Sequence, residues 1–135
     1  MSLIIIEGKV KGKARPRFNT KTGRAYSTDD TISYENWIRW CYRHSCNDFI
    51  DGPIRATIKC FMEIPKSYSK KKIKAIEEDK LFPTKKPDVD NIAKIVLDSL
   101  NGIAYKDDAQ VVELVVLKKF TTEKERVELE LESLI

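Results

Sequence analysis

Acidic residues gather at an unusual spacing near the middle of the chain, in the run from Lys85 to Asp98. Asp88 and Asp90 lie two residues apart, directly after a lysine pair and Pro87. If this stretch is extended, both carboxylates point the same way, about 7 Å apart along the backbone. Carboxylates held together repel one another unless a cation lies between them. Oxygen ligands of this kind suit Mg²⁺ or Mn²⁺ shared with a phosphate, so the run predicts metal-assisted hydrolysis of a phosphodiester.

Three further residues extend this set. Asp107 and Asp108 form an acidic pair in a polar turn after the run, and either carboxylate would complete a metal site. Lys94 follows Asp90 by one helical turn, where its amine would brace a carboxylate or stabilise charge that builds on the phosphate. The pattern leaves a second interpretation open, in which Asp88 and Asp90 only cap a helix and the other charged residues form surface ion pairs or a simple turn.

The residues after Asp90 are predicted to form a helix with one buried face. From Ile92 to Ile103 the apolar residues recur at helical spacing, and Asn101-Gly102 is a typical C-terminal stop. A polar row faces the other way at spacings of three and four residues. Its members are Asn91, Lys94, Asp98 and Asn101. The helix therefore carries chemical groups on one side and packs with the other.

A basic arm, residues 9–27, precedes this region. No acidic residue occurs between Lys9 and Ser27, and the first five basic residues alternate, so an extended chain would place them on one side. A hairpin or long loop with a turn near Thr22-Gly23 is expected here, and Phe18 and Tyr26 offer flat surfaces for stacking against an unstacked base. The arm therefore predicts contact with nucleic-acid phosphates, while a solvated loop is the alternative. The candidate DNA-contacting residues are Lys9, Lys11, Lys13, Arg15, Arg17, Lys21 and Arg24 in the arm, with Lys85 and Lys86 before the acidic run.

The charge distribution favours an anionic partner. The chain carries 25 Lys and Arg against 21 Asp and Glu, a net charge of +4. Residues 1–28 hold seven of the basic residues and one Glu, so the rest of the chain has a net charge of −2. A basic arm on a mildly acidic body is typical of a protein that binds nucleic acid.

The remaining pattern predicts an α+β fold, a mixed α/β sandwich. Runs rich in β-branched or alternating residues predict strands over 3–11, 54–64, 109–120 and 126–134. Helices are expected over 31–47 and 69–80. These elements would form a small, mainly antiparallel or mixed sheet of about four strands packed against helices. The whole chain, 1–135, is expected to be one domain, with residues 66–84 as an insertion. The aromatic residues of the first helix are interpreted as core or dimer packing; they are Tyr34, Trp37 and Trp40.

Composition excludes several other classes of protein. No apolar run approaches the roughly 20 residues of a membrane span, and the N-terminus has no basic region for a signal peptide. Cys41, Cys46 and Cys60 form no Cys-x-x-Cys pair, which is typical of reduced thiols rather than disulfides or zinc ligands. A cytoplasmic protein is expected, with no membrane partner and no small-molecule cofactor.

The acidic region resembles the RusA family of Holliday-junction resolvases over residues 85–113. The motifs that carry the resemblance are Pro87-Asp88-Val89-Asp90-Asn91, Lys94, Leu97-Asp98-Ser99-Leu100-Asn101-Gly102 and Asp107-Asp108-Ala109-Gln110-Val111-Val112. The arm sequence Arg15-Pro16-Arg17 resembles a subset of the family that is commonly carried by phages or prophages.

This resemblance implies a small homodimeric endonuclease that depends on Mg²⁺, with Mn²⁺ as an alternative ion. It implies a branched DNA substrate, the four-way junction, cut by paired symmetric nicks through attack of metal-activated water. The catalytic residues that it implies are Asp88, Asp90, Asp108 and Lys94. The metal ligands that it implies are Asp88, Asp90, Asp107 and Asp108. Asp98 matches a neighbouring acidic position of the family.

The sequence thus leads to the hypothesis of a structure-selective DNA endonuclease, in which the basic arm holds phosphates and the carboxylates hold the metal. Two other hypotheses stay open. The first is a non-catalytic protein of the same fold that binds junctions or single-stranded DNA, which Mg²⁺-dependent nicking would exclude. The second is a protein-interaction adaptor that uses its aromatic helix, 31–47, as the interface and has no affinity for DNA at physiological salt.

Overall fold

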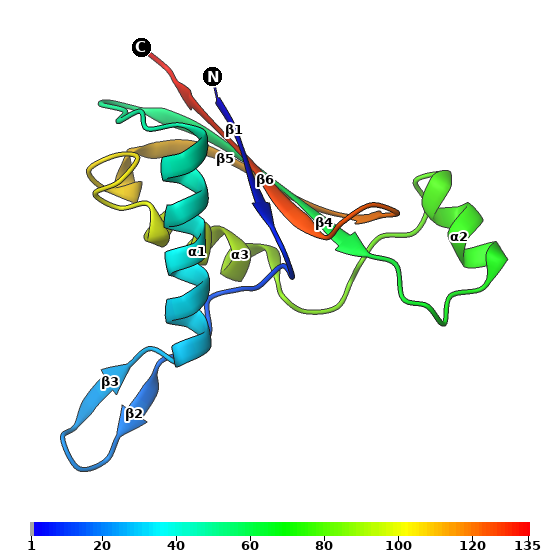
Figure 1. The fold of residues 1–135 in the computed structure, drawn as a ribbon, viewed down its shortest axis with the longest axis horizontal. Coiled ribbons are helices and arrows are strands. Elements are labelled where there is room, and N and C mark those ends of the chain that lie inside the picture. Colours follow the sequence, from blue (N-terminus) through cyan, green and yellow to red (C-terminus); the bar gives the residue numbers. More distant parts are fainter. Residues whose placement is uncertain (1) are drawn as a thin grey trace.

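A four-stranded sheet forms the centre of the protein (Figure 1). The computed structural model describes residues 2–135. The strand order is β1-β6-β4-β5, so β1 and β5 are the two edges of the sheet. The strands are β1 (Ser2–Glu7), β4 (Ile54–Glu63), β5 (Val111–Thr121) and β6 (Arg126–Ser133).

The sheet is mixed. β6 pairs antiparallel with both β1 and β4, whereas β4 and β5 run parallel. A parallel pair needs a long crossover connection, and residues 64–110 supply it here. The crossover contains α2 (Lys70–Glu77), α3 (Val89–Ser99) and the 3₁₀ turn η1 (Asp108–Gln110). The expected α+β fold, with a mixed sheet of four strands packed against helices, is confirmed.

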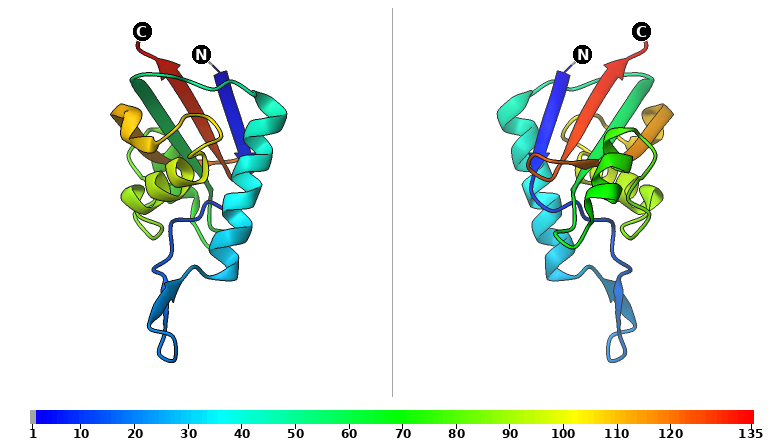
Figure 2. Two further views of the ribbon diagram at one scale, coloured as in Figure 1. Left: turned by 90° about the vertical axis from the view of Figure 1, so that its left-hand side faces the viewer. Right: turned by 90° about the vertical axis from the view of Figure 1, so that its right-hand side faces the viewer.

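Two helices, α1 (Asp29–Ser45) and α3, cover one face of the sheet (Figure 2). Side chains alternate along a strand, so every second strand residue points to this face. The buried strand residues are Ile4, Ile6, Ile54, Ala56, Ile58, Cys60, Val127, Leu129 and Leu131. On α3 the predicted apolar stripe is confirmed, because Ile92, Ile95, Val96 and Leu100 are completely buried. The opposite side of α3 carries the predicted polar row, which includes Lys94 and Asp98.

The second half of the basic arm, residues 17–26, forms a separate β-hairpin that projects from the body near the start of α1 (Figures 1 and 2). β2 (Arg17–Asn19) pairs antiparallel with β3 (Arg24–Tyr26), and every residue of both strands is exposed. The predicted turn near Thr22-Gly23 is confirmed. Gly23 has a φ of +70°, in the left-handed region that favours glycine, and its N–H donates to the Asn19 carbonyl at 2.8 Å.

Several element boundaries differ from the expected ones. The first strand ends at Glu7, because Gly8 has a φ of +114° and leads the chain away from the sheet edge. The first helix begins earlier than expected, at Asp29, because the Thr28 side chain accepts a hydrogen bond from the Thr31 N–H and caps it there.

Residues 66–84, which the sequence predicts to be an insertion, contain α2, and this helix stands away from the other helices (Figure 1). It is shorter than the expected 69–80, since Asp79 adopts a φ of 56° just after its end. The Ser69 side chain caps its first turn by accepting from the Lys72 N–H. No residue of α2 is buried. The insertion meets the sheet through an edge-on contact between the rings of Tyr68 and Phe120.

The aromatic residues of α1 do not share one environment. Tyr34 is 6% exposed and belongs to the core, as expected. Trp37 and Trp40 are 37% and 51% exposed, so the expectation of core packing is wrong for them in the single chain. Their rings stack on one another, and Trp40 stacks in turn on His44. Packing of the tryptophans at a dimer surface stays a prediction.

No helix within residues 2–135 has the length and apolar character needed to cross a membrane. Cys41, Cys46 and Cys60 form no disulfide within residues 2–135.

Candidate active site

The acidic run begins where α3 begins. Asp88 occupies the N-cap position with an extended backbone (φ −74°, ψ 153°), and Asp90 lies in the first helical turn. The expectation of two extended residues is therefore wrong, because the helix has already begun at Val89. The Asp88 carboxylate makes no capping hydrogen bond, and both aspartates are exposed. We call Asp88 and Asp90 the N-terminal acidic pair. Asp88 stands at the N-cap position, but its carboxylate is not used to cap the helix.

The sheet fixes the segment before the N-terminal acidic pair. Lys118 on β5 donates from its amine to the carbonyls of Lys85 (2.7 Å) and Pro87 (3.0 Å). Lys118 is paired across the strands with the buried Cys60, so its side chain emerges on the face that α3 covers. The backbone that leads into Asp88 is therefore held by β5.

The basic arm passes directly against the start of α3. The Lys13 N–H donates to the Asn91 carbonyl at 2.9 Å. A Cβ atom on Gly12 would lie 2.9 Å from the Asn91 Cβ and 3.0 Å from the Pro87 Cβ, so glycine is required for this approach. An open cleft of about 560 Å³ forms here, and its lining includes arm residues such as Arg15 together with Asp88.

A second acidic group lies toward the other end of α3. Asp98 of α3, with Asp107 and Asp108 beside η1, forms what we call the C-terminal acidic cluster. Burial, together with hydrogen bonds shared with Asp98 and Asp107, raises the pKa of Asp108 to about 6. The Asp108 N–H donates to the Asn101 side chain at 2.8 Å, and the Gln110 side chain accepts from the Asp107 N–H at 3.1 Å. Local caps therefore hold these carboxylates near one another.

Helix geometry separates the two acidic groups. Asp90 and Asp98 belong to the same helix, two turns apart, which corresponds to roughly 12 Å along its axis. Lys94 lies between them on the exposed side, one turn from each. The residues predicted from the sequence are thus brought to one side of α3, in two groups with a lysine between them.

The donor types suit a divalent cation, but residues 2–135 bring no three Asp, Glu, His or Cys side chains together at a point where they could hold a metal ion. Mg²⁺ is often held by one or two carboxylates with water and a substrate phosphate, so a complete protein cage is not required. Burial is the largest cause of the raised Asp108 pKa, and repulsion from Asp98 and Asp107 adds to it; a bound cation would relieve that repulsion. The assignment of metal ligands stays a prediction for Asp88, Asp90, Asp107 and Asp108.

The basic residues of the arm divide into two classes. Lys11 pairs with Asp30 at 2.7 Å, and Lys13 pairs with Glu35 at 2.9 Å. DNA contact by all five alternating residues stays a prediction, but carboxylates of α1 already hold Lys11 and Lys13 in ion pairs. The exposed candidates for DNA contact are Lys9, Arg15, Arg17, Lys21, Arg24, Lys85 and Lys86.

A larger hollow, of about 990 Å³, lies elsewhere, between Gly8 and residues 122–125. Four glutamates and two lysines line it, so its charge opposes that of a DNA backbone. One of the glutamates, Glu125, already accepts hydrogen bonds from the Val10 and Glu63 N–H groups. The cleft beside Asp88 is therefore the better candidate for phosphate chemistry.

Sequence reasoning gave no role to three residues that position the site, namely Glu35, Lys118 and Gln110, although Gln110 stands in one of the motifs. Glu35 and Lys118 act through contacts with residues far away in the chain, which leave no local pattern. The Gln110 amide likewise donates to the Ile50 and Gly52 carbonyls across the fold. Gln110 alone had a local signal, because it stands three residues after Asp107 at the spacing of a capping box.

Comparison with known proteins adds a family match. The family model described as endodeoxyribonuclease RusA matches residues 7–132, which include the basic arm, α3 and both acidic groups. An uncharacterized protein of Bacillus subtilis (strain 168), YqaN, is 38% identical over 128 residues. That alignment covers 91% of this chain and 89% of YqaN.

Proposed function

The chain belongs to the RusA endodeoxyribonuclease family, and from this premise we propose that it is a Mg²⁺-dependent, structure-selective DNA endonuclease. Its substrate would be the four-way (Holliday) junction, cut by paired symmetric nicks. The observation that carries the proposal is the cleft in which Arg15 and Lys86 line the same space as Asp88. Cations of this kind bind DNA phosphates, so a phosphodiester held there would lie next to an uncapped carboxylate.

The proposed chemistry divides among the residues along α3. The N-terminal acidic pair and the pair Asp107 and Asp108 would each hold Mg²⁺, with water and a substrate phosphate as the remaining ligands. When bound, the ion supplies polarisation of the phosphate and a nucleophilic water near neutral pH. Lys94, exposed between the two acidic groups, would stabilise negative charge as it builds on the phosphate.

The hairpin favours branched DNA over a continuous duplex as the substrate. Phe18 is 64% exposed and Tyr26 is 50% exposed. The register pairs Phe18 with Ala25 and Arg17 with Tyr26, so Phe18 and the Arg17–Tyr26 pair lie on opposite faces of the ribbon. A two-stranded ribbon fits the major groove, and an exposed phenylalanine inserts where a base step is opened. A junction offers such an opened step at its branch point.

We propose a homodimer as the active species. Paired symmetric nicks require two sites related by a two-fold axis, and a two-fold symmetric substrate is matched by an isologous dimer. If the protein is bacterial or phage-encoded, a DNA substrate would place it in the cytoplasm, at the nucleoid.

The direct test is cleavage of a labelled four-way junction with and without Mg²⁺, beside linear duplex and forked DNA of matched sequence. We expect paired nicks in the junction only when Mg²⁺ is present, and weaker or no cleavage of the linear duplex. Tight junction binding without any nicking would instead favour the alternative, a non-catalytic binding protein of the same fold. Equal cleavage of all three substrates would reject the selectivity for branched DNA.

A further inference from the structure

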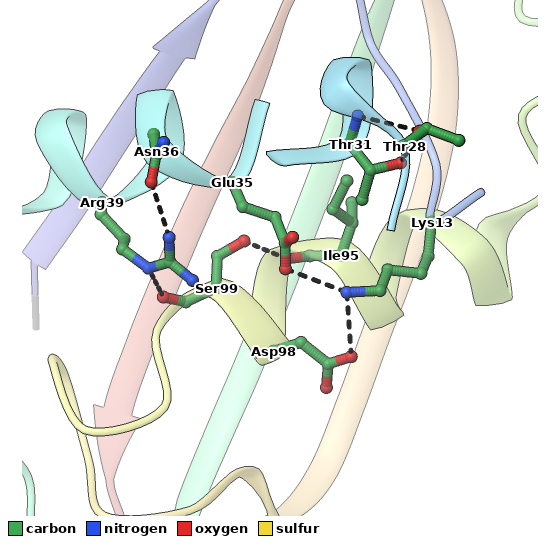
Figure 3. A network of polar contacts seen from close by, with 9 residues as sticks. All are labelled: Lys13, Thr28, Thr31, Glu35, Asn36, Arg39, Ile95, Asp98 and Ser99. Atoms are coloured by element: carbon green, nitrogen blue, oxygen red, sulfur yellow. Dashed lines mark hydrogen bonds and ion pairs between the residues drawn. The ribbon is translucent and has the colours of Figure 1, made fainter. Parts of the chain in front are cut away.

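Lys13 has the sequence position of a DNA contact but the surroundings of an internal ion. Its amine lies 2.9 Å from the Glu35 carboxylate and 3.8 Å from the Asp98 carboxylate (Figure 3). The exposed fractions of these three side chains are 18%, 12% and 30%. The neighbouring ion pair of the arm differs, because Lys11 pairs there with Asp30, whose side chain is 73% exposed.

This burial makes Lys13 a poor ligand for a phosphate. To reach DNA, the amine would have to leave both carboxylates, and the nearly enclosed Glu35 would lose the cation that lies 2.9 Å from it. An ion pair that is shielded from water is costly to break when one charge stays behind unpaired. Lys13 is therefore expected to remain with its carboxylates when DNA binds.

The ion pair joins three segments that are distant in the sequence. Lys13 belongs to the arm, Glu35 to α1 and Asp98 to α3. A second link runs beside it, because the Arg39 side chain on α1 donates to the Ser99 carbonyl at 2.9 Å (Figure 3). The C-terminal end of α3 is thus fixed to α1 at two points.

Lys13 also contacts both ends of α3. Its backbone N–H donates to the Asn91 carbonyl near the start of the helix, and its amine reaches Asp98 near the end. Asp98 in turn belongs to the C-terminal acidic cluster, where its carboxylate lies close enough to Asp108 to act on the pKa of that residue. One residue of the arm therefore bears on the position of both acidic groups.

We propose that Lys13 is a positioning residue of the cleavage site, with Glu35 as its counter-ion. It neutralises Asp98 and fixes the arm against α3, so that the phosphate-binding residues and the acidic groups keep one relative placement. It does not contact DNA. The inference rests on the proposed nuclease function, but its claim about DNA contact is measurable without cleavage.

The experiment uses the full chain with Lys13→Met, Glu35→Gln and the charge exchange Lys13→Glu/Glu35→Lys. Two quantities are measured for each: the cleavage rate at saturating junction with Mg²⁺, and the salt dependence of junction binding without Mg²⁺. A phosphate contact contributes about one unit to the slope of log K against log salt. We expect Lys13→Met and Glu35→Gln to lower the cleavage rate about tenfold, as loss of an orienting partner does, with the slope unchanged.

The charge exchange gives a rescue that a loss of folding would not show. The exchange puts the ammonium at position 35, beside the carboxylates at positions 13 and 98. We therefore expect it to recover most of the cleavage rate lost in Lys13→Met. If Lys13→Met unfolds, Glu35→Gln and the exchange carry the test, with thermal unfolding confirming that they are folded. Arg55→Met is the matched control, because Arg55 also binds two carboxylates, Glu113 and Glu132, on the sheet. It should change neither quantity.

Each outcome decides the inference. A slope of log K against log salt that falls by about one in Lys13→Met would show that Lys13 contacts a phosphate, which would overturn the inference. A cleavage rate unchanged in Lys13→Met and Glu35→Gln, or not recovered by the exchange, would overturn the positioning role. A wild-type protein that binds junctions but never nicks them would reject the proposed function separately, and the slope would then decide whether Lys13 touches DNA.

Discussion

The α3 region and the β2–β3 hairpin are two halves of one proposed site, and they are built in opposite ways. α3 buries Ile92, Ile95 and Leu100 completely against the sheet, and its acidic residues extend from that packed base. The hairpin buries nothing, since every residue of both its strands is exposed. It is joined to the body through the arm that passes over the start of α3 (Figure 1).

The difference follows from what each half has to do. Groups that carry out chemistry must be held within a fraction of an ångström, which a helix packed on a sheet provides. Groups that hold phosphates need charge and reach, and they tolerate small displacements. Changes in the α3 region should therefore affect the cleavage rate and stability, whereas changes in the hairpin should affect DNA affinity.

The largest expected effect comes from the N-terminal acidic pair. Asp88→Asn or Asp90→Asn should lower junction cleavage by more than about 100-fold, because loss of a ligand exceeds the effect of losing a ligand's supporting partner. Binding should be retained, since an exposed negative charge is removed from the cleft. Gel-based cleavage and binding assays measure both. Asp29→Asn, an exposed residue in the first turn of α1, is the control; full cleavage by either α3 variant would contradict the assignment.

The next effect concerns stability and separates the two halves directly. Ile95→Ala removes a completely buried side chain and should lower the free energy of unfolding by about 2–5 kcal/mol. Phe18→Ala, in the hairpin, should change it by less than about 0.5 kcal/mol. Denaturant unfolding measures both, and similar losses would mean that the hairpin is packed more firmly than its exposure indicates.

A smaller effect is expected from the arm's exposed arginines. Arg15→Gln combined with Arg17→Gln should weaken junction binding and lower the slope of log K against log salt by about two, because each removes one phosphate contact. The melting temperature should not change. Binding measured over a series of salt concentrations provides the test, and an unchanged slope would mean that the arm does not lie on the DNA.

The smallest effect concerns the pH dependence of stability at Asp108. Burial and the neighbouring Asp98 and Asp107 raise the pKa of Asp108 to about 6 in the folded protein, above its ordinary value of 3.8. The folded state thus holds this proton more tightly than the unfolded chain, so the group's contribution to stability falls as pH rises from about 4 to about 6. Asp108→Asn should therefore raise the melting temperature of the metal-free protein near neutral pH. The gain should vanish below about pH 4, and a loss of stability at neutral pH would contradict it.

Local patterns explain which parts of the fold were predictable. The buried stripe of α3 and the turn at Gly23 depend on residues close together in the sequence, and both were predicted correctly. The strand order was not, because β1 and β6 are neighbours from opposite ends of the chain. The parallel pairing of β4 with β5 likewise has no local signal.

The candidate site shows the same division. The residue types and the motif around Asp88, Asp90 and Asp108 were predictable, because they lie in short runs. Their separation into two groups was predictable only in part. A helix through Asp90 and Asp98 already spaces these two carboxylates, whereas the place of Asp108 depends on contacts such as that of its N–H with the Asn101 side chain. The inward turn of Lys13 was missed as well, because alternation along a strand says nothing of a carboxylate on a helix that follows later in the chain.

The crossover between the parallel strands has a consequence for synthesis of the protein. All the proposed catalytic residues lie within residues 64–110, and the loop ahead of Asp88 is tied to Lys118, which emerges later from the ribosome. Pairings between distant strands form late in folding, whereas a hairpin such as β2–β3 closes on its own neighbours. We expect the DNA-binding hairpin of a nascent chain to fold before the catalytic site, so that DNA binding precedes the ability to cleave.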